Sequence, residues 1–395
     1  MNILFITPSD PARRCSGVAQ RSALLHEALS RLGQVYTVIP TFLRQREFDD
    51  ASRRVRCVCI ERRYGPAWFL KQLLKRTIPL VVLPLYAAAA PSRLYPGVVF
   101  DCVVVRYAQW AAYYAPWRIA PVILDLDDDP VEVFETLVQP RISRPLRGLQ
   151  HRIVRRWRDG VLARCHGVWV ANAGQQEGLP ARRVAHLHNL ALPPGPAYAA
   201  YGRQENQLVA VGSLGYGPHR DGVDRFVADC WPSIRQAFPE LRLVIAGREC
   251  PPRLARRWGQ CAGVDVVGYV EDLDDLYARS LMAVAPVYGG GGTSIKVIEA
   301  LLHERHCLVT DFAVRGWSPD DIRSANGLVR YTGPAALPGV LRPLFVTIRR
   351  TPGYGKPFAD LAARRFSPDE FQSAVADMVA GVVSREQKRA APDAS

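Results

Sequence analysis

Short apolar runs alternate with amphipathic helical patterns along most of the chain, and this alternation constrains the fold more than any other feature. Strand-like runs in the first half cover residues 2–7, 34–40, 55–61, 98–106, 121–125, 167–171 and 184–187, and an amphipathic helix is expected over 18–32. In the second half they cover 208–214, 241–246, 264–270, 281–287 and 307–310. This rhythm is typical of βαβ units in a parallel sheet.

The alternation stops once and then restarts. The interruption, LALPPGPAYAAYGRQENQ, is rich in proline and glycine and predicts a linker near residues 190–206. We therefore predict an α/β protein with two doubly wound domains, residues 1–195 and 205–368. Because such domains bind ligands at the carboxyl ends of their strands, the active site is expected in a cleft between the domains.

The composition narrows the class of protein. With 48% hydrophobic residues over 395 positions, the chain can bury more core than one ordinary domain needs. The longest uncharged apolar run, residues 78–90, contains two prolines and is shorter than the roughly 20 residues that cross a bilayer. Nine scattered cysteines without a CxxC pair indicate neither a disulfide framework nor a zinc site. Since MNILFITPSD also lacks the features of a signal peptide, we expect a cytoplasmic protein.

Residues 281–310, LMAVAPVYGGGGTSIKVIEALLHERHCLVT, join an apolar strand to a helix through four consecutive glycines. Glycine lets backbone N–H groups approach a ligand closely, and a helix N-terminus adds unpaired donors and the positive end of the helix dipole. The segment therefore indicates a site for a nucleotide diphosphate. The alternative, a flexible surface loop, fits poorly with a buried-type strand that runs directly into a good helix.

Several segments carry a family resemblance in their order and spacing. They are TPSDPARRCSGVAQR, VAHLHNLAL, VAVGSLGYGPHRDGVDRFV, LRLVIAGRE, VVGYVEDLDDLYARS and VAPVYGGGGTSIKVIEAL. In this succession the chain resembles the retaining glycosyltransferases of family 4, which have the two-domain GT-B fold. The resemblance implies transfer of a sugar from a nucleotide-sugar donor with retention at the anomeric carbon, and without a metal or other cofactor. It also implies a terminal helix over 369–390 that packs back on the first domain.

The resemblance assigns a donor site. Glu299 matches the last glutamate of the family's paired-glutamate motif, and a carboxylate suits the ribose hydroxyls because it accepts two hydrogen bonds. The alternative for Glu299 is a helix-surface ion pair with Lys296. Gly291 stands where the motif has its first glutamate, so backbone N–H groups are expected to contact the sugar and phosphate instead. The expected donor-binding residues are Gly17, Gly212, Arg220, Arg248, Tyr269, Gly290, Gly291, Gly292, Thr293, Ser294 and Glu299.

A departing phosphate needs positive charge, which the family supplies from the start of its second domain. Here we rank Lys296 and Arg248 above Arg220, and the same segment also offers His219. Lys296 is therefore a candidate catalytic residue as well as a donor contact.

An acidic run, LDLDDD, carries Asp125 to Asp129 at the end of the strand predicted over 121–125 and leaves three interpretations open. One is a metal site of the DxD type, which belongs to glycosyltransferases of another fold, so no metal is expected. In the second, Asp127 and Asp128 are catalytic residues that orient the acceptor hydroxyl or the sugar. In the third, these carboxylates cap the following helix.

The formal net charge of +14 favours a polyanionic partner. Residues 144–165 combine arginines with helically spaced apolar side chains, which fit either the protein core or an anionic membrane surface. The apolar positions are Leu146, Leu149, Ile153, Trp157 and Val161, and Lys71, Lys75 and Arg76 would extend the same surface. The chain lacks the stacking aromatics and recognition modules of nucleic-acid readers, so no nucleic-acid partner is expected.

The primary prediction is a glycosyltransferase of the hexosyltransferase type, cytoplasmic and peripheral on the membrane, that builds a surface polysaccharide or glycolipid on a glycan or lipid-linked acceptor. Fold analogy carries part of this prediction. One alternative is a nucleotide-sugar epimerase or hydrolase of the same fold. Another is a catalytically silent basic scaffold on membrane or nucleic acid, which Gly291 in place of a glutamate favours.

Overall fold

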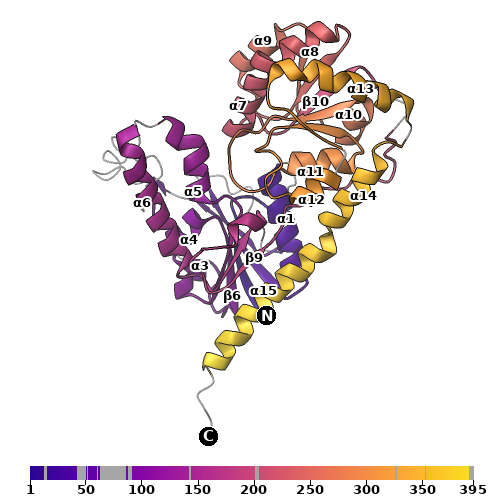
Figure 1. Ribbon diagram of the computed structural model, residues 1–395. Helices are drawn as coiled ribbons and strands as arrows, with labels where there is room; N and C mark the ends of the chain where they lie inside the picture. Colours follow the sequence, from indigo (N-terminus) through magenta and orange to yellow (C-terminus); the bar gives the residue numbers. More distant parts are fainter. Residues whose placement is uncertain are drawn as a thin grey trace. The chain divides into compact units, whose positions relative to one another are not determined.

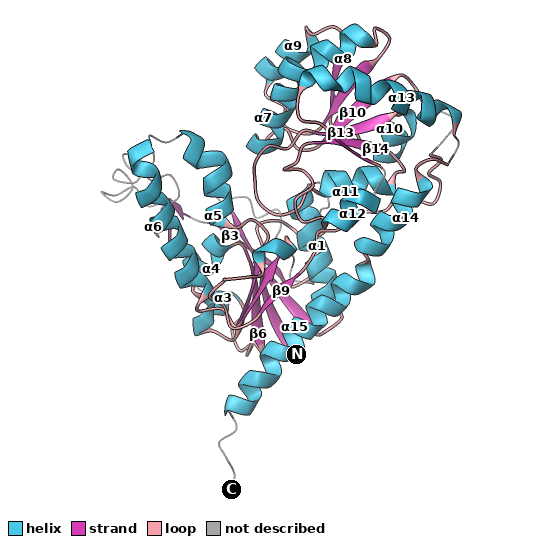
Figure 2. Ribbon diagram, viewed as in Figure 1, coloured by secondary structure: helices cyan, strands magenta, loops and turns pink. Residues whose placement is uncertain are grey.

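The computed structural model describes residues 1–12, 16–41, 50, 52–59, 61–62, 86–87, 91–141, 144–200, 204–324, 327–351 and 353–390. It divides into two compact units, and in each a parallel sheet carries helices on both faces (Figures 1 and 2). The first unit comprises Met1–His188, Gly290–Gly292 and Pro368–Ser395, and the second comprises Asn189–Gly289 and Thr293–Ser367. The α/β class with two doubly wound domains is therefore confirmed.

The first unit is built on a seven-stranded sheet of order β3-β2-β1-β6-β7-β8-β9, in which all neighbouring pairs are parallel. Its strands are β1 (Asn2–Ile6), β2 (Gln34–Thr41), β3 (Val55–Cys59), β6 (Cys102–Arg106), β7 (Val122–Leu126), β8 (Gly167–Val170) and β9 (Val184–His186). A separate antiparallel pair joins β4 (Glu61–Arg62) to β5 (Tyr86–Ala87). Most of the predicted run 78–90 lies outside the described residues, as do Lys71, Lys75 and Arg76.

The central strands of this sheet are buried on both faces, which explains their continuous apolar runs. Every residue of β6, β7 and β8 is buried, and seven of their fourteen residues are β-branched valine or isoleucine. The helices of the unit are α1 (Gly17–Ser30), α3 (Pro91–Leu94), α4 (Ala108–Tyr114), α5 (Pro130–Val133), α6 (Arg144–Leu162) and α15 (Pro368–Ala390). Shorter helical turns are η1 (Pro116–Arg118), η2 (Phe134–Val138), η3 (Gln139–Arg141) and η4 (Ala173–Gln175).

Two helices from opposite ends of the chain cover one face of the first sheet. Figure 1 shows α1 and α15 side by side, and Gln372 Nε2 donates a hydrogen bond to the carbonyl of Ala28 at 3.2 Å. Gly167 allows the close approach of α15 to β8, because a Cβ at this position would lie 2.5 Å from Met378 Sδ. The terminal helix predicted over 369–390 is α15, which belongs to the first unit.

The second unit has a six-stranded parallel sheet of order β12-β11-β10-β13-β14-β15. Its strands are β10 (Gln207–Val211), β11 (Arg242–Ala246), β12 (Val264–Gly268), β13 (Met282–Ala285), β14 (His306–Val309) and β15 (Leu328–Arg330). Its helices are α7 (Gly217–Arg225), α8 (Trp231–Ala237), α9 (Pro252–Gly259), α10 (Leu273–Arg279), α11 (Ile295–Leu302), α12 (Pro319–Ser324), α13 (Leu337–Arg350) and α14 (Lys356–Arg365), with the turns η5 (Phe226–Cys230) and η6 (Pro334–Ala336).

Strand order fixes where each sheet opens towards a ligand. In the first sheet the order reverses between β1 and β6, and in the second it reverses between β10 and β13. Doubly wound sheets bind ligands at this reversal, beyond the carboxyl ends of the two strands. The residues that follow β1, β6, β10 and β13 are therefore expected to line a ligand site in each unit.

Helix α6 is only partly buried, so it is not an ordinary core helix along its whole length. Its inner face buries Gln150, Val154 and Val161, whereas the predicted apolar positions Leu146 and Leu149 are 37% and 55% exposed. The apolar stripe read from the sequence therefore leaves the core near the N-terminal end of the helix. No helix among the described residues is long and apolar enough to cross a bilayer.

Candidate functional site

The strand reversal of the second sheet brings two basic side chains together around a glycine. Gly212 follows β10 directly and has a φ of +152°. A Cβ at this position would lie 2.5 Å from Lys296 Cε and 2.7 Å from His219 Nε2. Glycine is therefore required here for space as well as for conformation, and it lets α7 and α11 present His219 and Lys296 at one point.

Burial lowers the pKa of both basic groups. Burial, with a contribution from the neighbouring Lys296 cation, holds the pKa of His219 well below its ordinary value. Burial also lowers the pKa of Lys296, and the nearby Glu299 opposes that effect. His219 is only 1% exposed, and neither of its ring nitrogens has a hydrogen-bond partner among the described residues.

Glu299 is a buried carboxyl group with one oxygen already held by the protein. The Tyr277 hydroxyl donates to its Oε2 at 3.0 Å, and Glu299 is 8% exposed. Burial raises the pKa of Glu299, although the Tyr277 hydrogen bond and the charge of Lys296 act in the opposite direction. Within the residues that the structure describes, Glu299 forms no ion pair with Lys296, so the surface ion pair offered as the alternative is wrong.

A second layer of side chains fixes the position of Tyr277. Its ring stacks on His303 with centroids 4.3 Å apart, and Arg305 Nε donates to the Tyr277 carbonyl at 2.8 Å. His303 in turn lies 2.7 Å from the Glu299 carbonyl through Nδ1 and 2.9 Å from Asp274 Oδ1 through Nε2. Sequence analysis did not assign Tyr277, His303 or Asp274 to the site, and their only sequence signal is that they lie within or next to the resembling segments.

The other predicted donor residues lie in different surroundings. Arg248 Cζ lies 3.9 Å from the ring centroid of Tyr269, and Tyr269 is 56% exposed, so this pair offers a flat surface next to the end of β12. Thr293 Oγ1 accepts a hydrogen bond from Asn189 Nδ2 at 3.0 Å. Arg220 Nη2 lies 3.3 Å from the carboxylate of its chain neighbour Asp221.

The remaining predicted glycines belong to the first unit. Gly17 is the first residue of α1, whose N-cap Ser16 accepts a hydrogen bond from Ala19 N at 3.2 Å. Gly290 N donates to Thr136 Oγ1 at 3.2 Å. A Cβ at Gly291 would overlap the carboxylate and the Cα of Asp128, so any side chain there must displace Asp128. This crowding is a physical reason for glycine at the position where the family motif has a glutamate.

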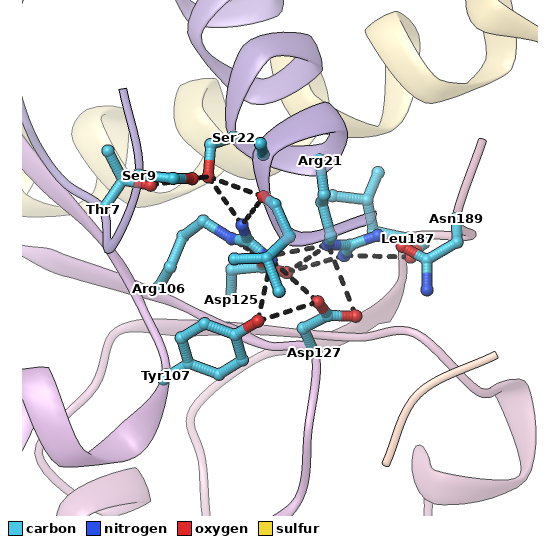
Figure 3. Close-up of polar contacts among 12 residues, drawn as sticks. Thr7, Ser9, Arg21, Ser22, Arg106, Tyr107, Asp125, Asp127, Leu187 and Asn189 are labelled. Carbon is cyan, nitrogen blue, oxygen red and sulfur yellow. Dashed lines mark hydrogen bonds and ion pairs between the residues drawn. The ribbon is translucent and has the colours of Figure 1, made fainter. Parts of the chain in front are cut away.

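The strand reversal of the first sheet carries a buried network of two arginines and two aspartates (Figure 3). Asp125 accepts hydrogen bonds from Arg21 Nη2 at 2.6 Å and from Arg106 Nε at 2.9 Å. Arg106 Nη2 also donates to Asp127 Oδ2 at 2.7 Å. Burial opposes ionisation of Asp125, but the two arginine charges outweigh it and hold its pKa below the ordinary value. The charges of the two arginines and the two aspartates sum to zero, which reduces the cost of burying them. The hydrogen bond from Arg106 fixes the orientation of the Asp127 carboxylate.

The backbone around this network is under strain. Tyr107 follows β6 with a φ of 68° and a ψ of 136°, a combination that costs a bulky residue about 1–3 kcal/mol. Its hydroxyl donates to Asp127 Oδ2 at 3.4 Å. Such strain persists where the surroundings over-determine a geometry, which is common at functional sites. Sequence analysis named the acidic run that contains Asp125 and Asp127 but missed the residues that contact Asp127, which are Arg21, Arg106 and Tyr107.

The acidic run that suggested a metal is engaged with protein groups. Asp129 caps α5 by accepting a hydrogen bond from Val131 N at 2.8 Å, and it pairs with Arg158 at 2.6 Å. Asp125 is neutralised by arginines, as described above. Among the described residues no group of three or more histidine, cysteine or acidic side chains is arranged to hold a metal ion. The capping interpretation thus holds for Asp129.

Comparisons with known proteins agree with this architecture. The first unit and the second together have the GT-B fold, and residues 205–336 match the family model described as glycosyl transferases group 1. No curated protein matches the chain.

Solved structures resemble the whole chain at low sequence identity. Sucrose-phosphate synthase from Thermosynechococcus elongatus is 15% identical with a TM-score of 0.69, over 99% of this chain and 100% of that one. HepE from Anabaena, solved in complex with UDP-glucose, is 13% identical with a TM-score of 0.61, over 96% and 100%. WaaG, a glycosyltransferase involved in lipopolysaccharide biosynthesis, is 15% identical with a TM-score of 0.58, over 96% and 99%. At these identities the likeness establishes the fold.

Proposed function

We propose that the protein is a glycosyltransferase that moves a sugar from a nucleotide-diphosphate-sugar to an acceptor hydroxyl. The observation that carries this proposal is the arrangement at the strand reversal of the second sheet, where Lys296, Gly212 and the half-satisfied Glu299 gather. These residues fall inside the segment that matches the glycosyltransferase model. A related fold, that of HepE, has been solved with UDP and with UDP-glucose, which supports a donor of this chemical class.

The donor's nucleotide would be held through Glu299. Its Oε2 is occupied by Tyr277, and its Oε1 accepts no hydrogen bond from the described residues. The vicinal diol of ribose presents two hydroxyl donors, which would hydrogen-bond to the Glu299 carboxylate and favour its ionised form. The Lys296 ammonium, one helical turn earlier on α11, would then lie close to the diphosphate and stabilise its charge.

The chemistry we propose retains the configuration of the anomeric carbon through attack on the same face that the leaving group departs from. The bond between the anomeric carbon and the phosphate oxygen breaks while the acceptor oxygen forms a new bond to that carbon. The acceptor proton passes to the departing phosphate oxygen, so no protein base is consumed. The protein's contribution is position and electrostatic stabilisation, and no metal is required.

Asp127 is the proposed contact for the acceptor. Its carboxylate is oriented by Arg106 and Tyr107 at the carboxyl end of β7, and part of it remains exposed. An ionised carboxylate accepts a hydrogen bond from a sugar hydroxyl and can fix its direction of attack. We propose orientation for Asp127, and a supporting position next to it for Asp128.

Helix α6 supports a lipid-linked or membrane-borne acceptor. Its exposed residues include Arg152, Arg155 and Arg156 together with Leu146 and Leu149, so cationic and apolar groups share one accessible surface. Each basic residue near an anionic bilayer contributes about 1 kcal/mol of attraction. We therefore propose a peripheral membrane protein whose acceptor is a glycan or a lipid-linked saccharide used for surface polysaccharide or glycolipid synthesis.

A turnover assay tests the activity. UDP-, GDP- and ADP-sugars are incubated with and without a crude membrane-lipid acceptor, and the products are identified with their anomeric configuration. A transferase releases nucleoside diphosphate rapidly only with the acceptor and forms a product of retained configuration. Free nucleotide or an altered sugar from the donor alone would instead favour the hydrolase or epimerase, and no turnover would favour the scaffold.

Variants locate that activity in the proposed site. Lys296→Ala is expected to lower the transfer rate by about 100-fold, because it removes a cation from the developing phosphate charge. Lys356→Ala is the matched control, since Lys356 is exposed and paired with Asp360 on α14. Wild-type turnover in Lys296→Ala would remove Lys296 from the site.

A further inference from the structure

His219 is a buried side chain whose polar atoms have no partner. It is 1% exposed, and both ring nitrogens lack a hydrogen bond to any residue that the structure describes. Leaving a buried polar group unsatisfied costs about 1–3 kcal/mol. Since native proteins rarely keep such a group without a reason, a ligand that supplies the missing partner is indicated.

The position of His219 shows where that ligand atom would lie. The ring edge that carries Nε2 and the Lys296 side chain both lie against Gly212, because a Cβ at Gly212 would be 2.7 Å from His219 Nε2 and 2.5 Å from Lys296 Cε. Another polar group nearby is also unsatisfied: Ser294 occupies the N-cap of α11, yet its hydroxyl makes no capping bond and has no partner in the described structure. An N-cap serine usually bonds to its own helix. The second unit therefore contains two side chains near Lys296, His219 and Ser294, that have no hydrogen-bond partner in the described structure.

The ring is in its neutral form, because burial and the adjacent Lys296 cation both disfavour a second positive charge. A neutral imidazole has one N–H donor. Because this donor lies next to an ammonium group, its preferred partner is an anionic oxygen. Lysine would supply charge at this point, and the imidazole would supply direction.

We propose that His219 is a further catalytic residue, whose Nε2–H donates a hydrogen bond to an oxygen of the sugar-bearing phosphate of the donor. This inference rests on the proposed function. The oxygen that links this phosphate to the sugar gains negative charge as its bond to the anomeric carbon breaks. A fixed donor aimed at such an oxygen contributes more in the transition state than in the ground state.

Ligand binding separates this role from a structural one. His219→Leu removes the donor, whereas His219→Gln places an amide N–H near the position of Nε2. For the base that the wild type prefers, the Kd of the nucleoside diphosphate and of the monophosphate are measured by calorimetry. We expect His219→Leu to weaken diphosphate binding about tenfold or more and to leave monophosphate binding unchanged, with His219→Gln within a few-fold of wild type. Transfer by His219→Leu should lose about 100-fold in kcat with little change in KM.

Several results would overturn the inference. Equal losses for monophosphate and diphosphate would indicate a structural role, and wild-type affinity of His219→Leu for both ligands would show that His219 does not contact the second phosphate. If His219→Leu does not fold, His219→Asn replaces it, because its shorter amide cannot reach the same point. Failure of the wild type to bind any nucleoside diphosphate would reject the proposed function itself, and the inference with it.

Discussion

Tyr277 orients Glu299, the residue proposed to bind the ribose of the donor. Tyr277→Phe removes only the hydroxyl that holds Glu299 Oε2, so the carboxylate loses its fixed orientation and one hydrogen bond of about 1.5–3 kcal/mol. We expect a loss of roughly tenfold in nucleoside diphosphate affinity, measured by calorimetry. Tyr95→Phe is the matched control, because the buried Tyr95 hydroxyl bonds the carbonyl of Thr37 in the first unit. An equal affinity loss in both variants would contradict the assigned role.

His219 also predicts how stability depends on pH. Its folded-state pKa is depressed by burial and by Lys296, so the unfolded chain binds a proton on this group more readily than the folded protein does. The neutral His219 ring therefore contributes its full stabilisation above about pH 6.5, which is the ordinary pKa of histidine in the unfolded chain. This contribution to the unfolding free energy is lost as the pH falls towards the folded-state pKa.

The measurement compares wild type with His219→Asn by urea denaturation at pH 7.5 and pH 5.5. Between these conditions the wild type should lose about 1 kcal/mol more unfolding free energy than the variant. The same pH dependence in both proteins would mean that His219 is protonated in the folded state as easily as in the unfolded state.

Single residues mark the limit of what sequence can predict about the site. Gly212 and Lys296 were named as candidate site residues from the sequence. They lie close together in the structure because Gly212 follows a strand and Lys296 lies at the start of a helix, and the sequence indicates both elements. Tyr277, Arg21 and Arg106 were missed, because each acts through a partner distant in the chain. Arg21 meets Asp125 across 104 positions, a pairing that only tertiary packing reveals.

Among the secondary-structure elements, the buried strands were the most predictable. The predicted runs 208–214 and 241–246 correspond to β10 (Gln207–Val211) and β11 (Arg242–Ala246), since continuous apolar runs follow from burial on both faces. The strand β15 was missed, because its three residues Leu328–Arg330 are too short and too exposed to produce a pattern. The two alternatives for α6 were not separable from the sequence, because helical spacing gives the apolar stripe but not the length over which a neighbour covers it.

Helix α6 is the element that tests membrane association. Arg152 and Arg156 are exposed and have no ion-pair partner among the described residues, so both are available for lipid phosphates. Replacing both with glutamine should remove about 2 kcal/mol, or roughly 30-fold, of affinity for phosphatidylcholine vesicles that contain phosphatidylglycerol.

The control for this charge change lies on α9 of the second unit. Arg253→Gln with Arg256→Gln alters the net charge by the same amount at two exposed positions. Vesicle sedimentation should show wild-type binding for this control. A similar loss in both double variants would mean that binding reflects net charge and not the surface of α6.

At the scale of the whole molecule, the buried arginine–aspartate network ties together elements that are far apart in the first unit. Arg106→Met leaves Asp125 and Asp127 buried with less compensation, so we expect the unfolding free energy of the protein to fall by about 3–5 kcal/mol. Arg330→Met is the control, because Arg330 pairs with Asp311 at an exposed site and should cost at most about 1 kcal/mol. Chemical denaturation measures both. Equal small losses would show that the network does not stabilise the unit.

The central claim is that the second unit binds a nucleoside diphosphate through the residues around Glu299 and Lys296. Calorimetric titration of the full chain with UDP, GDP and ADP at up to millimolar concentration tests it most directly. We predict saturable binding of at least one of them by the wild type, and a loss of at least tenfold in affinity for that ligand in Glu299→Ala. The claim would be contradicted by the absence of binding to all three, or by equal affinity in wild type and Glu299→Ala.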